Sequence, residues 1–130
     1  MPIKIIYTED GLGVKYVARG ITTGEEVIQT NNKVINDKRF PSLKYKIADR
    51  SECDKYLVDG ASVQIVAEQE REASQLNPDL IVALISGSEV QFGMSRMYQS
   101  LMAGMGFECD IFEDQEAAMQ WINKKIQKSE

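Results

Sequence analysis

The apolar run of residues 80–85 constrains the fold more than any other stretch of this 130-residue chain. Its sequence, LIVALI, contains no polar side chain, whereas a strand with one wet face would alternate apolar and polar residues. Such a run is typical of a central parallel strand that is covered on both faces, and it is far too short to cross a bilayer. We therefore expect a sheet covered by helices and no stable insertion into a membrane.

Before this run, the sequence predicts a hairpin and then a helix. Residues 3–7 and 14–19 have strand character and are joined by the turn-rich sequence EDGLG. Residues 20–41 carry a helix pattern that ends at a proline. Either Thr22 or Thr23 can cap this helix, because each stands three residues before a glutamate.

A third strand and a second helix follow. Residues 43–49 predict the strand, and a polar stretch continues to about Leu57. The helix is predicted from Asp59 to Leu76, where Asn-Pro-Asp ends it. Its apolar residues form a narrow stripe that we expect to lie against the sheet. The stripe consists of Ile65, Val66, Ala73 and Leu76.

Residues 89–106, which follow the apolar run, contain four methionines. Methionine packs irregular core gaps and also lines adaptable binding grooves. Here the apolar residues recur at helical spacing on one face, which favours core packing over a recognition surface. Gly106 stands where a left-handed helix cap is expected. The apolar face consists of Met94, Met97, Tyr98, Leu101, Met102 and Met105.

The chain closes with a fifth strand, residues 107–113, and a helix capped by Asp114. Cys109 alternates with apolar neighbours, so we expect it to point into the core. The inward face of the last helix consists of Ala118, Trp121, Ile122 and Ile126. The order ββαβαβαβα predicts one domain over residues 1–130, an α/β fold with a mixed five-stranded sheet and four helices.

The chain has no histidine, which removes His-dependent triads, His general bases and the commonest metal ligand. No paired motif of other catalytic residue types appears, so we expect no catalytic residues, no cofactor and no metal site. Cys53 and Cys109 form no C-x-x-C motif, and two isolated thiols indicate a reducing compartment. Because the first residues do not resemble a signal peptide, a cytoplasmic location is expected.

Charge is unevenly distributed along the sequence. The net charge of −5 argues against binding to nucleic acid. Basic residues dominate residues 33–50, whereas acidic residues dominate residues 52–79. Solvated helix faces are the usual reason for such runs, and the functional alternative is a partner surface that carries both signs of charge.

Three stretches resemble a known family. They are residues 80–101 (LIVALISGSEVQFGMSRMYQSL), residues 110–122 (DIFEDQEAAMQWI) and residues 44–69 (KYKIADRSECDKYLVDGASVQIVAEQ). With the element order, they resemble the SpoIIAA-like (STAS/SEC14-type) small bacterial domains over nearly the whole chain. The resemblance implies a cytoplasmic α/β domain, in a family of which many members have no assigned activity.

In the anti-sigma-factor antagonists of this family, Asp-Ser-Ser-Gly opens the helix after the third strand, and its phosphoserine switches partner binding. Residues 59–62 of this chain read Asp-Gly-Ala-Ser, so the order differs and the switch is not carried over. Ser62 and Ser51 remain candidate phosphorylation sites, because added charge at a helix start would change a docking surface. The alternative is that Asp59 caps the helix beside an ordinary surface serine.

These observations leave two classes of function open. The first is a non-catalytic regulatory module that binds another protein. The second is a domain that binds a small molecule, an anion or a lipid. The resemblance implies a lipid cavity in the SEC14-type relatives, for which 130 residues leave little chain.

A ligand site, if present, is expected beyond the carboxyl ends of the central strands. Two loops are predicted there, Asp49-Arg50-Ser51 and Ser86-Gly87-Ser88. The second loop leads into a helix start, whose free amides favour an anion. Arg96 could fold back to add a bidentate fork. The alternative is that Ser88 caps the helix and Arg96 pairs with an acid.

A homodimer is also a candidate. Small residues lie off the apolar stripe of the methionine-rich helix and would allow another helix to approach closely. They are Gly93, Ser100, Ala103 and Gly104.

Overall fold

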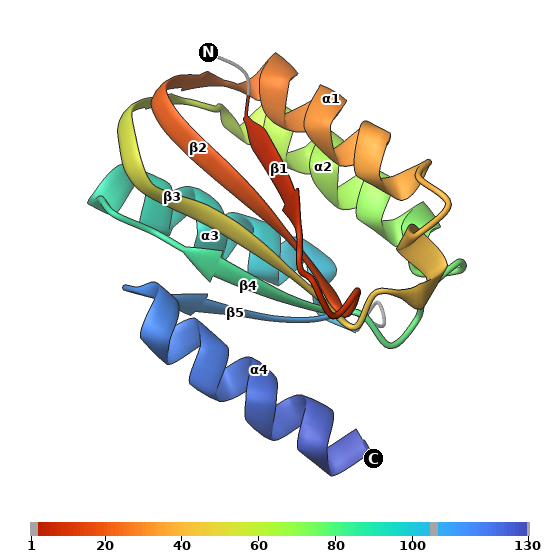
Figure 1. The fold of residues 1–130 in the computed structure, drawn as a ribbon. Helices are drawn as coiled ribbons and strands as arrows, with labels where there is room; N and C mark the ends of the chain where they lie inside the picture. Colours follow the sequence, from red (N-terminus) through yellow and green to blue (C-terminus); the bar gives the residue numbers. More distant parts are fainter. Residues whose placement is uncertain (1–2, 105–106, 130) are drawn as a thin grey trace.

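The computed structural model describes residues 3–104 and 107–129, and its elements follow the predicted order (Figure 1). The strands are β1 (Lys4–Tyr7), β2 (Gly13–Thr23), β3 (Tyr45–Leu57), β4 (Ile81–Ile85) and β5 (Glu108–Phe112). The helices are α1 (Gly24–Ile35), α2 (Gly60–Ala73), α3 (Glu89–Met102) and α4 (Gln115–Ser129), and a short 3-10 helix, η1 (Phe40–Ser42), precedes β3. The predicted ββαβαβαβα fold is confirmed.

The strands form one sheet in the order β1-β2-β3-β4-β5. β1 and β2 are antiparallel and form the predicted hairpin, whereas β2 to β5 are parallel. The turn between β1 and β2 includes Gly11, whose φ of 73° lies in the left-handed region that favours glycine. The sheet is therefore mixed, as predicted.

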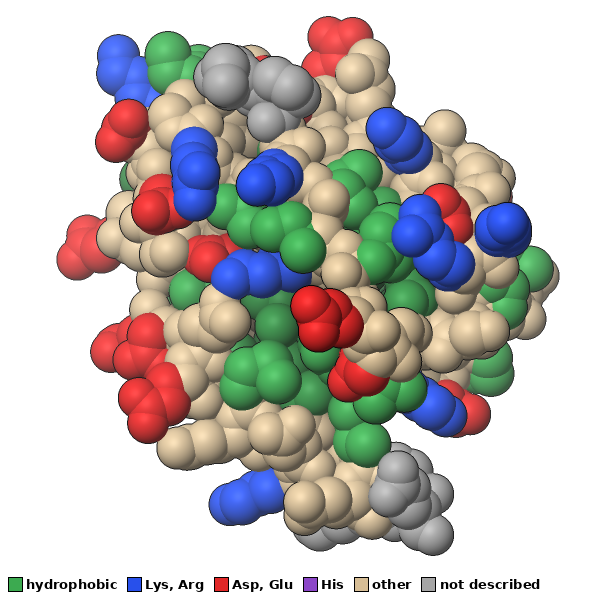
Figure 2. Space-filling model, viewed as in Figure 1, with side chains coloured by type: hydrophobic (Ala, Val, Ile, Leu, Met, Phe, Trp, Pro, Cys, Tyr) green, Lys and Arg blue, Asp and Glu red, His purple; other side chains and the backbone are tan. Residues whose placement is uncertain are grey.

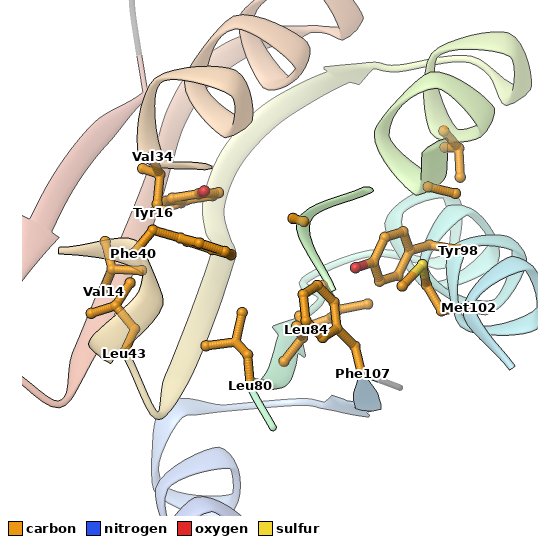
Figure 3. Packing of buried hydrophobic residues seen from close by; sticks show 14 of the residues in the cluster. Val14, Tyr16, Val34, Phe40, Leu43, Leu80, Leu84, Tyr98, Met102 and Phe107 are labelled. Atoms are coloured by element: carbon orange, nitrogen blue, oxygen red, sulfur yellow. The ribbon is translucent and has the colours of Figure 1, made fainter. Parts of the chain in front are cut away.

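Helices cover both faces of the sheet, with α1, α2 and α3 on one side and α4 on the other (Figure 1). All five residues of β4 are buried, so the coverage predicted from the apolar run is confirmed. Strand alternation turns Val82 and Leu84 toward the three-helix side, and Ile81, Ala83 and Ile85 toward α4. Figure 3 shows the larger of the two resulting cores.

α1 is shorter than the pattern predicted. Thr23, not Thr22, caps it, because its Oγ1 accepts a hydrogen bond from the backbone N–H of Glu26 at 3.3 Å. The helix ends at Ile35, well before Pro41, which lies instead in η1. Asp37 accounts for the early end of the helix. Its carboxylate accepts a hydrogen bond from the backbone N–H of Arg39 at 2.8 Å, which competes with the backbone hydrogen bonds that would continue the helix.

α2 buries only part of the predicted stripe: Ala73 is buried and Val66 packs partly buried against the core, as predicted. Ile65 and Leu76 are 49% and 56% exposed, so their assignment to the core face was wrong. The buried residues of this helix are Val63, Ala67, Glu70 and Ala73. Because Glu70 occupies one of these buried positions, the spacing of apolar residues alone does not identify the buried face of α2.

α3 confirms the core assignment of the methionine-rich segment. Tyr98 and Met102 are buried, and Met94, Met97 and Leu101 pack partly buried against the same core. Met105 and Gly106, the predicted cap, lie outside the described residues.

The last strand and helix also follow the prediction. Asp114 Oδ1 accepts the backbone N–H of Ala117 at 2.9 Å, as expected of a helix cap. Ala118 and Ile122 are fully buried against the sheet. Cys109 packs partly buried against the three-helix core, and burial raises the pKa of its thiol to about 12.

Candidate functional site

β3 is much longer than predicted and outlasts its neighbour β4. Pairing with β4 ends where Asp49 lies opposite Ile85, whereas pairing with β2 continues to Leu57. Beyond Asp49, β2 and β3 therefore form a two-stranded ribbon. The prediction that Asp49, Arg50 and Ser51 form a loop after the strand was wrong, because the polar residues that suggested it belong to this ribbon.

A β-bulge lies at the start of the ribbon. Asp49 pairs with Val17 and Glu52 pairs with Arg19, so two residues of β3 lie opposite one of β2. The two residues of β3 in the bulge are Arg50 and Ser51, and they lie opposite Ala18 of β2. A bulge of this kind bends the strand and can redirect a side chain.

Strand alternation separates the three residues that the sequence analysis grouped together. Asp49 faces α4, where its Oδ2 lies 3.5 Å from Lys15 Nζ, which also bonds Gln115 of α4. Ser51 is exposed and donates its hydroxyl to Asp49 Oδ1 at 2.7 Å. Burial raises the pKa of Asp49, but the bonds from Ser51 and the charge of Lys15 outweigh it, so the net pKa is lowered. Arg50 alone reaches the three-helix side.

On that side, a partly enclosed cavity of about 80 Å³ lies between the sheet and helices α1, α2 and α3. A cavity needs roughly 10–15 Å³ of this kind of volume for each water molecule, so several waters or one small molecule would fit. Most of the wall is apolar. The apolar wall includes Val27, Val58, Val63, Val66, Val82, Leu84 and Met94.

Arg50 lies at one end of the cavity and is only 8% exposed. Its guanidinium donates to Tyr56 Oη at 3.0 Å, to Ser86 Oγ at 3.1 Å and to Ser95 Oγ. Its Nε has no acceptor among the described residues, and no described carboxylate lies within ion-pair distance. A positive charge is thus buried beside the cavity, bonded to neutral hydroxyls and 5.2 Å from the centre of the Tyr56 ring.

The other polar end of the cavity is electrically balanced. Lys46 of β3 forms an ion pair with Glu70 of α2, and both side chains are buried. Asn31 Oδ1 accepts from Lys46 Nζ and from Tyr16 Oη, each at 3.1 Å. The positive and negative charges at this end cancel.

Two buried atoms at this end form no hydrogen bond of close geometry with any other residue in the described part of the chain. They are Glu70 Oε2 and Tyr98 Oη, and both residues line the cavity. Figure 3 shows the Tyr98 hydroxyl directed from α3 into the interior. Burial raises the pKa of Tyr98 well above its ordinary value, and Glu70 raises it further through its negative charge and a side-chain hydrogen bond with the Tyr98 hydroxyl.

The structure brings only part of the predicted Ser86-Gly87-Ser88 loop into this site. Ser86 Oγ lies 3.0 Å from Ser95 Oγ and accepts from Arg50. Gly87 packs against β3, where an added Cβ would lie 3.2 Å from Ser51 Cα. Ser88 caps α3 by accepting the backbone N–H of Gln91 at 3.2 Å, which is the alternative reading of this serine.

Arg96 does not fold back toward the loop. It is exposed, and its guanidinium carbon lies 5.6 Å from the centre of the Phe92 ring. The N–H of Gly87 already donates to the Gln91 side chain at 2.7 Å, which leaves this helix start less open to an anion than expected. The guanidinium beside the Ser86 hydroxyl belongs to Arg50, whereas the sequence analysis expected Arg96 to supply a guanidinium there. Anion binding by the loop itself stays a prediction.

Sequence reasoning missed most of the cavity wall. Lys46 carried one signal, because it interrupts the otherwise apolar centre of β3 between Tyr45 and Ile47. Glu70 carried another, since it stands seven residues after Val63 on the helix face that packs inward. The charge runs were interpreted as solvated faces, and that interpretation was wrong for Lys46, Arg50 and Glu70.

Ser62, the other candidate phosphorylation site, lies in the first turn of α2. Asp59 caps the helix by accepting the backbone N–H of Ser62 at 2.9 Å. The Ser62 side chain packs closely on α1, since a Cβ added to Gly24 would lie 2.1 Å from Ser62 Oγ. Phosphorylation at Ser62 or Ser51 stays a prediction.

Two features are absent from residues 3–104 and 107–129. No helix there combines the length and the apolar character that spanning a membrane requires. No group of three His, Cys, Asp or Glu side chains there is placed to hold a metal ion.

Comparison with known proteins identifies the fold. No model of a protein family matches the chain, and no curated protein matches it. The structure of SpoIIAA, an anti-sigma factor antagonist, in its unphosphorylated form aligns with a TM-score of 0.59 and 14% identity, over 94% of this chain and 96% of SpoIIAA. An uncharacterised DUF3478-family protein from Shewanella loihica PV-4, described as having a SpoIIAA-like fold, aligns with a TM-score of 0.56 and 19% identity, over 92% and 91% of the two chains. The resemblance inferred from the sequence is thus confirmed at the level of structure: this chain has the SpoIIAA-like fold.

Proposed function

We propose that this chain is a non-catalytic domain that binds one small organic anion in the cavity beneath α1, α2 and α3. The observation that carries the proposal is Arg50, a buried guanidinium with a free Nε and no counterion among the described residues. Burying an unpaired charge is costly, and a bound anion would supply both the missing charge and the missing acceptor. Such charge-assisted hydrogen bonds are among the strongest in proteins.

The size of the cavity favours a small anion over a lipid. Pockets for drug-sized ligands are typically about 300–1,000 Å³, and this one is about 80 Å³. The site also lies where the sequence analysis expected a ligand, because Ser86 directly follows the carboxyl end of β4. The charged residue of the site, however, is Arg50, which belongs to the extended strand β3 and not to a loop.

The test compares ligand-induced stabilisation in two arginine variants. Acetate, butyrate and inorganic phosphate, at constant ionic strength, are titrated against the wild type, Arg50→Met and Arg96→Met. Arg96→Met is the matched control, because it removes the same charge from an exposed position. A ligand at one hundred times its Kd stabilises a protein by about 2.7 kcal/mol, which shifts Tm by several degrees.

We expect at least one anion to raise the Tm of the wild type and of Arg96→Met but not that of Arg50→Met. If none does so, or if Arg50→Met responds as the wild type does, the proposal is wrong.

A second candidate function is binding to another protein, as the name of SpoIIAA implies for that relative. The outer face of the ribbon supports it: Ile21 and Leu57 are 50% and 59% exposed. Ile21 pairs with Lys55, two residues from Leu57, so the two apolar side chains lie on the same face. Figure 2 shows both signs of charge interspersed with hydrophobic side chains on the face it displays, and such mixed charge suits a protein partner better than nucleic acid.

Capture experiments distinguish this second function. The wild type, Leu57→Ser and Leu76→Ser are immobilised and exposed to a lysate, followed by identification of bound proteins. Leu76 is 56% exposed outside the ribbon and serves as the matched control. A partner retained by Leu76→Ser and lost by Leu57→Ser supports the ribbon surface, whereas equal recovery in all three counts against it.

We also propose a cytoplasmic location. Cys53 and Cys109 are both free thiols in the structure, which suits a reducing compartment.

A further inference from the structure

Ala48 lies at the middle of the cavity floor, which is the part of the wall that the sheet forms. Alternate residues of a strand share one face, and Lys46, Ala48 and Arg50 of β3 all line the cavity. Ala48 pairs with Tyr16 of β2 and with Leu84 of β4, so the smallest side chain of this row stands at its centre. The floor between the guanidinium and the buried ion pair is therefore apolar and low.

The polar end of the cavity around Glu70 is closed to a ligand. Lys46 Nζ donates to the Glu70 carboxylate and to Asn31 Oδ1, and the Tyr98 hydroxyl bonds the same carboxylate. Glu70 Oε2 and Tyr98 Oη are both buried. These groups interact with one another, so a polar group of a ligand placed here would lose its bonds to water and gain none in exchange.

The helices complete an apolar wall above this floor. Val63 and Val66 of α2 and Met94 of α3 line the cavity. Burial of one methylene group against such a wall strengthens binding about fourfold. An apolar tail therefore suits the space next to Arg50, whereas a second charge or a hydroxyl on that tail does not.

We propose that the ligand is a short-chain aliphatic monocarboxylate, with its carboxylate on Arg50 and its tail over Ala48. This inference rests on the proposed function. A cavity of about 80 Å³, at roughly 10–15 Å³ per water-sized group, holds about five to eight non-hydrogen atoms. The acids from propionate to hexanoate fall within this range. Inorganic phosphate also fits by size, but it gains nothing from the apolar wall.

The experiment measures calorimetric affinities of the full chain at constant ionic strength. The probes are acetate, butyrate, octanoate, 4-hydroxybutyrate and inorganic phosphate. We expect butyrate to bind the wild type about tenfold more tightly than acetate, because it buries two more methylene groups. Butyrate should also bind about tenfold more tightly than 4-hydroxybutyrate, whose hydroxyl would be buried without a partner. Octanoate exceeds the cavity and should bind more weakly than butyrate.

Two variants should change the preferred tail length in opposite directions. Ala48→Val fills the floor beneath the tail, so it should weaken butyrate binding and leave acetate binding unchanged. Val66→Ala enlarges the cavity, so it should raise the affinity for octanoate relative to butyrate. Ala61→Val is the matched control, because Ala61 is exposed and lies outside the cavity wall. A loss of stability alone would not change the ratio between two acids.

The outcomes separate this inference from the proposed function. If acetate or 4-hydroxybutyrate binds as tightly as butyrate, and Arg50→Met loses these acids, the aliphatic tail is overturned and the anion site stands. Ratios between the acids that stay unchanged in both Ala48→Val and Val66→Ala have the same consequence, as does binding of phosphate alone. Failure of all five probes to bind overturns the anion site together with the aliphatic acid.

Discussion

Lys46 of β3 and Glu70 of α2 form an ion pair inside the protein, where their side chains are 5% and 0% exposed. The pair joins the sheet to α2, and Asn31 connects it to α1 through a hydrogen bond from Lys46 Nζ at 3.1 Å. A buried pair of this kind adds little net stability over an apolar replacement, but removal of one partner leaves the other charge buried and unpaired.

Lys46→Met is therefore expected to lower the free energy of unfolding by about 3–5 kcal/mol, measured by urea denaturation. The double variant Lys46→Met/Glu70→Leu removes both charges and should recover most of that loss. A double variant that is no more stable than Lys46→Met would contradict this explanation.

Arg50→Met should behave differently from Lys46→Met. It removes a buried charge that has no counterion, so we expect the unfolding free energy in the absence of ligand to stay within about 1 kcal/mol of the wild type or to rise. The same urea titration measures it. A loss as large as that of Lys46→Met would show that Arg50 is needed for the fold and not for a ligand.

Gly24→Ala tests the contact between α1 and α2. An added Cβ would lie 2.1 Å from Ser62 Oγ and 2.7 Å from Ser62 Cβ, so the helices must separate, at a cost of about 1–3 kcal/mol. Adding Ser62→Gly should relieve the clash and make the two changes non-additive. Gly93→Ala is the control: nothing lies within 4 Å of its added Cβ, and about 0.5–1 kcal/mol of stabilisation is expected.

Cys109 is expected to be unreactive in the folded protein. Burial raises the pKa of its thiol from 9.0 to about 12, so almost no thiolate forms near pH 8. In a Cys53→Ser variant, alkylation at pH 8 should therefore require unfolding. Because the unfolded chain loses the thiol proton at lower pH than the folded chain, stability should fall between about pH 9 and 12. Rapid labelling of the folded Cys53→Ser variant would contradict the assignment.

The homodimer stays a prediction, and the structure indicates where to test it. Val90 and Phe92 are 59% and 45% exposed at the start of α3, next to Gly93, one of the small residues that suggested close approach. Light scattering at high micromolar concentration should detect a dimer, and Phe92→Ser should shift it toward monomer. Monomer alone at that concentration in the wild type would exclude the dimer.

The order of elements could be predicted because each element has a clear local signal. β4 is entirely apolar, the α3 face repeats at helical spacing, and Asp59, Ser88 and Asp114 each cap the helix that was expected to follow. These signals concern neighbours in the sequence, and the fold agrees with them.

The site could not be predicted in the same way, because its contacts are distant in the sequence. Arg50 bonds Ser86 and Ser95, which lie 36 and 45 residues further along the chain, and Lys46 bonds Glu70 across 24 residues. The polar residues after Asp49 have the composition of a loop, yet pairing with β2 extends the strand through them. Tertiary pairing thus overrides local preference where the cavity forms.

The alternation of side chains along β3 also limits how this site can change in evolution. Lys46 and Arg50 enter the cavity because they lie four positions apart, an even offset along the strand, while Asp49 between them faces α4. Deletion of one residue between Lys46 and Arg50 would exchange the faces of everything on one side of the deletion. If Ile47 or Ala48 were deleted and Lys46 kept its place, the carboxylate of Asp49 would move to the cavity wall at the position of Ala48, Ser51 would take the position of Arg50, and Arg50 would turn toward α4. Substitutions at these positions would therefore change the charge of the cavity one side chain at a time, whereas a change in strand length would invert it in a single step.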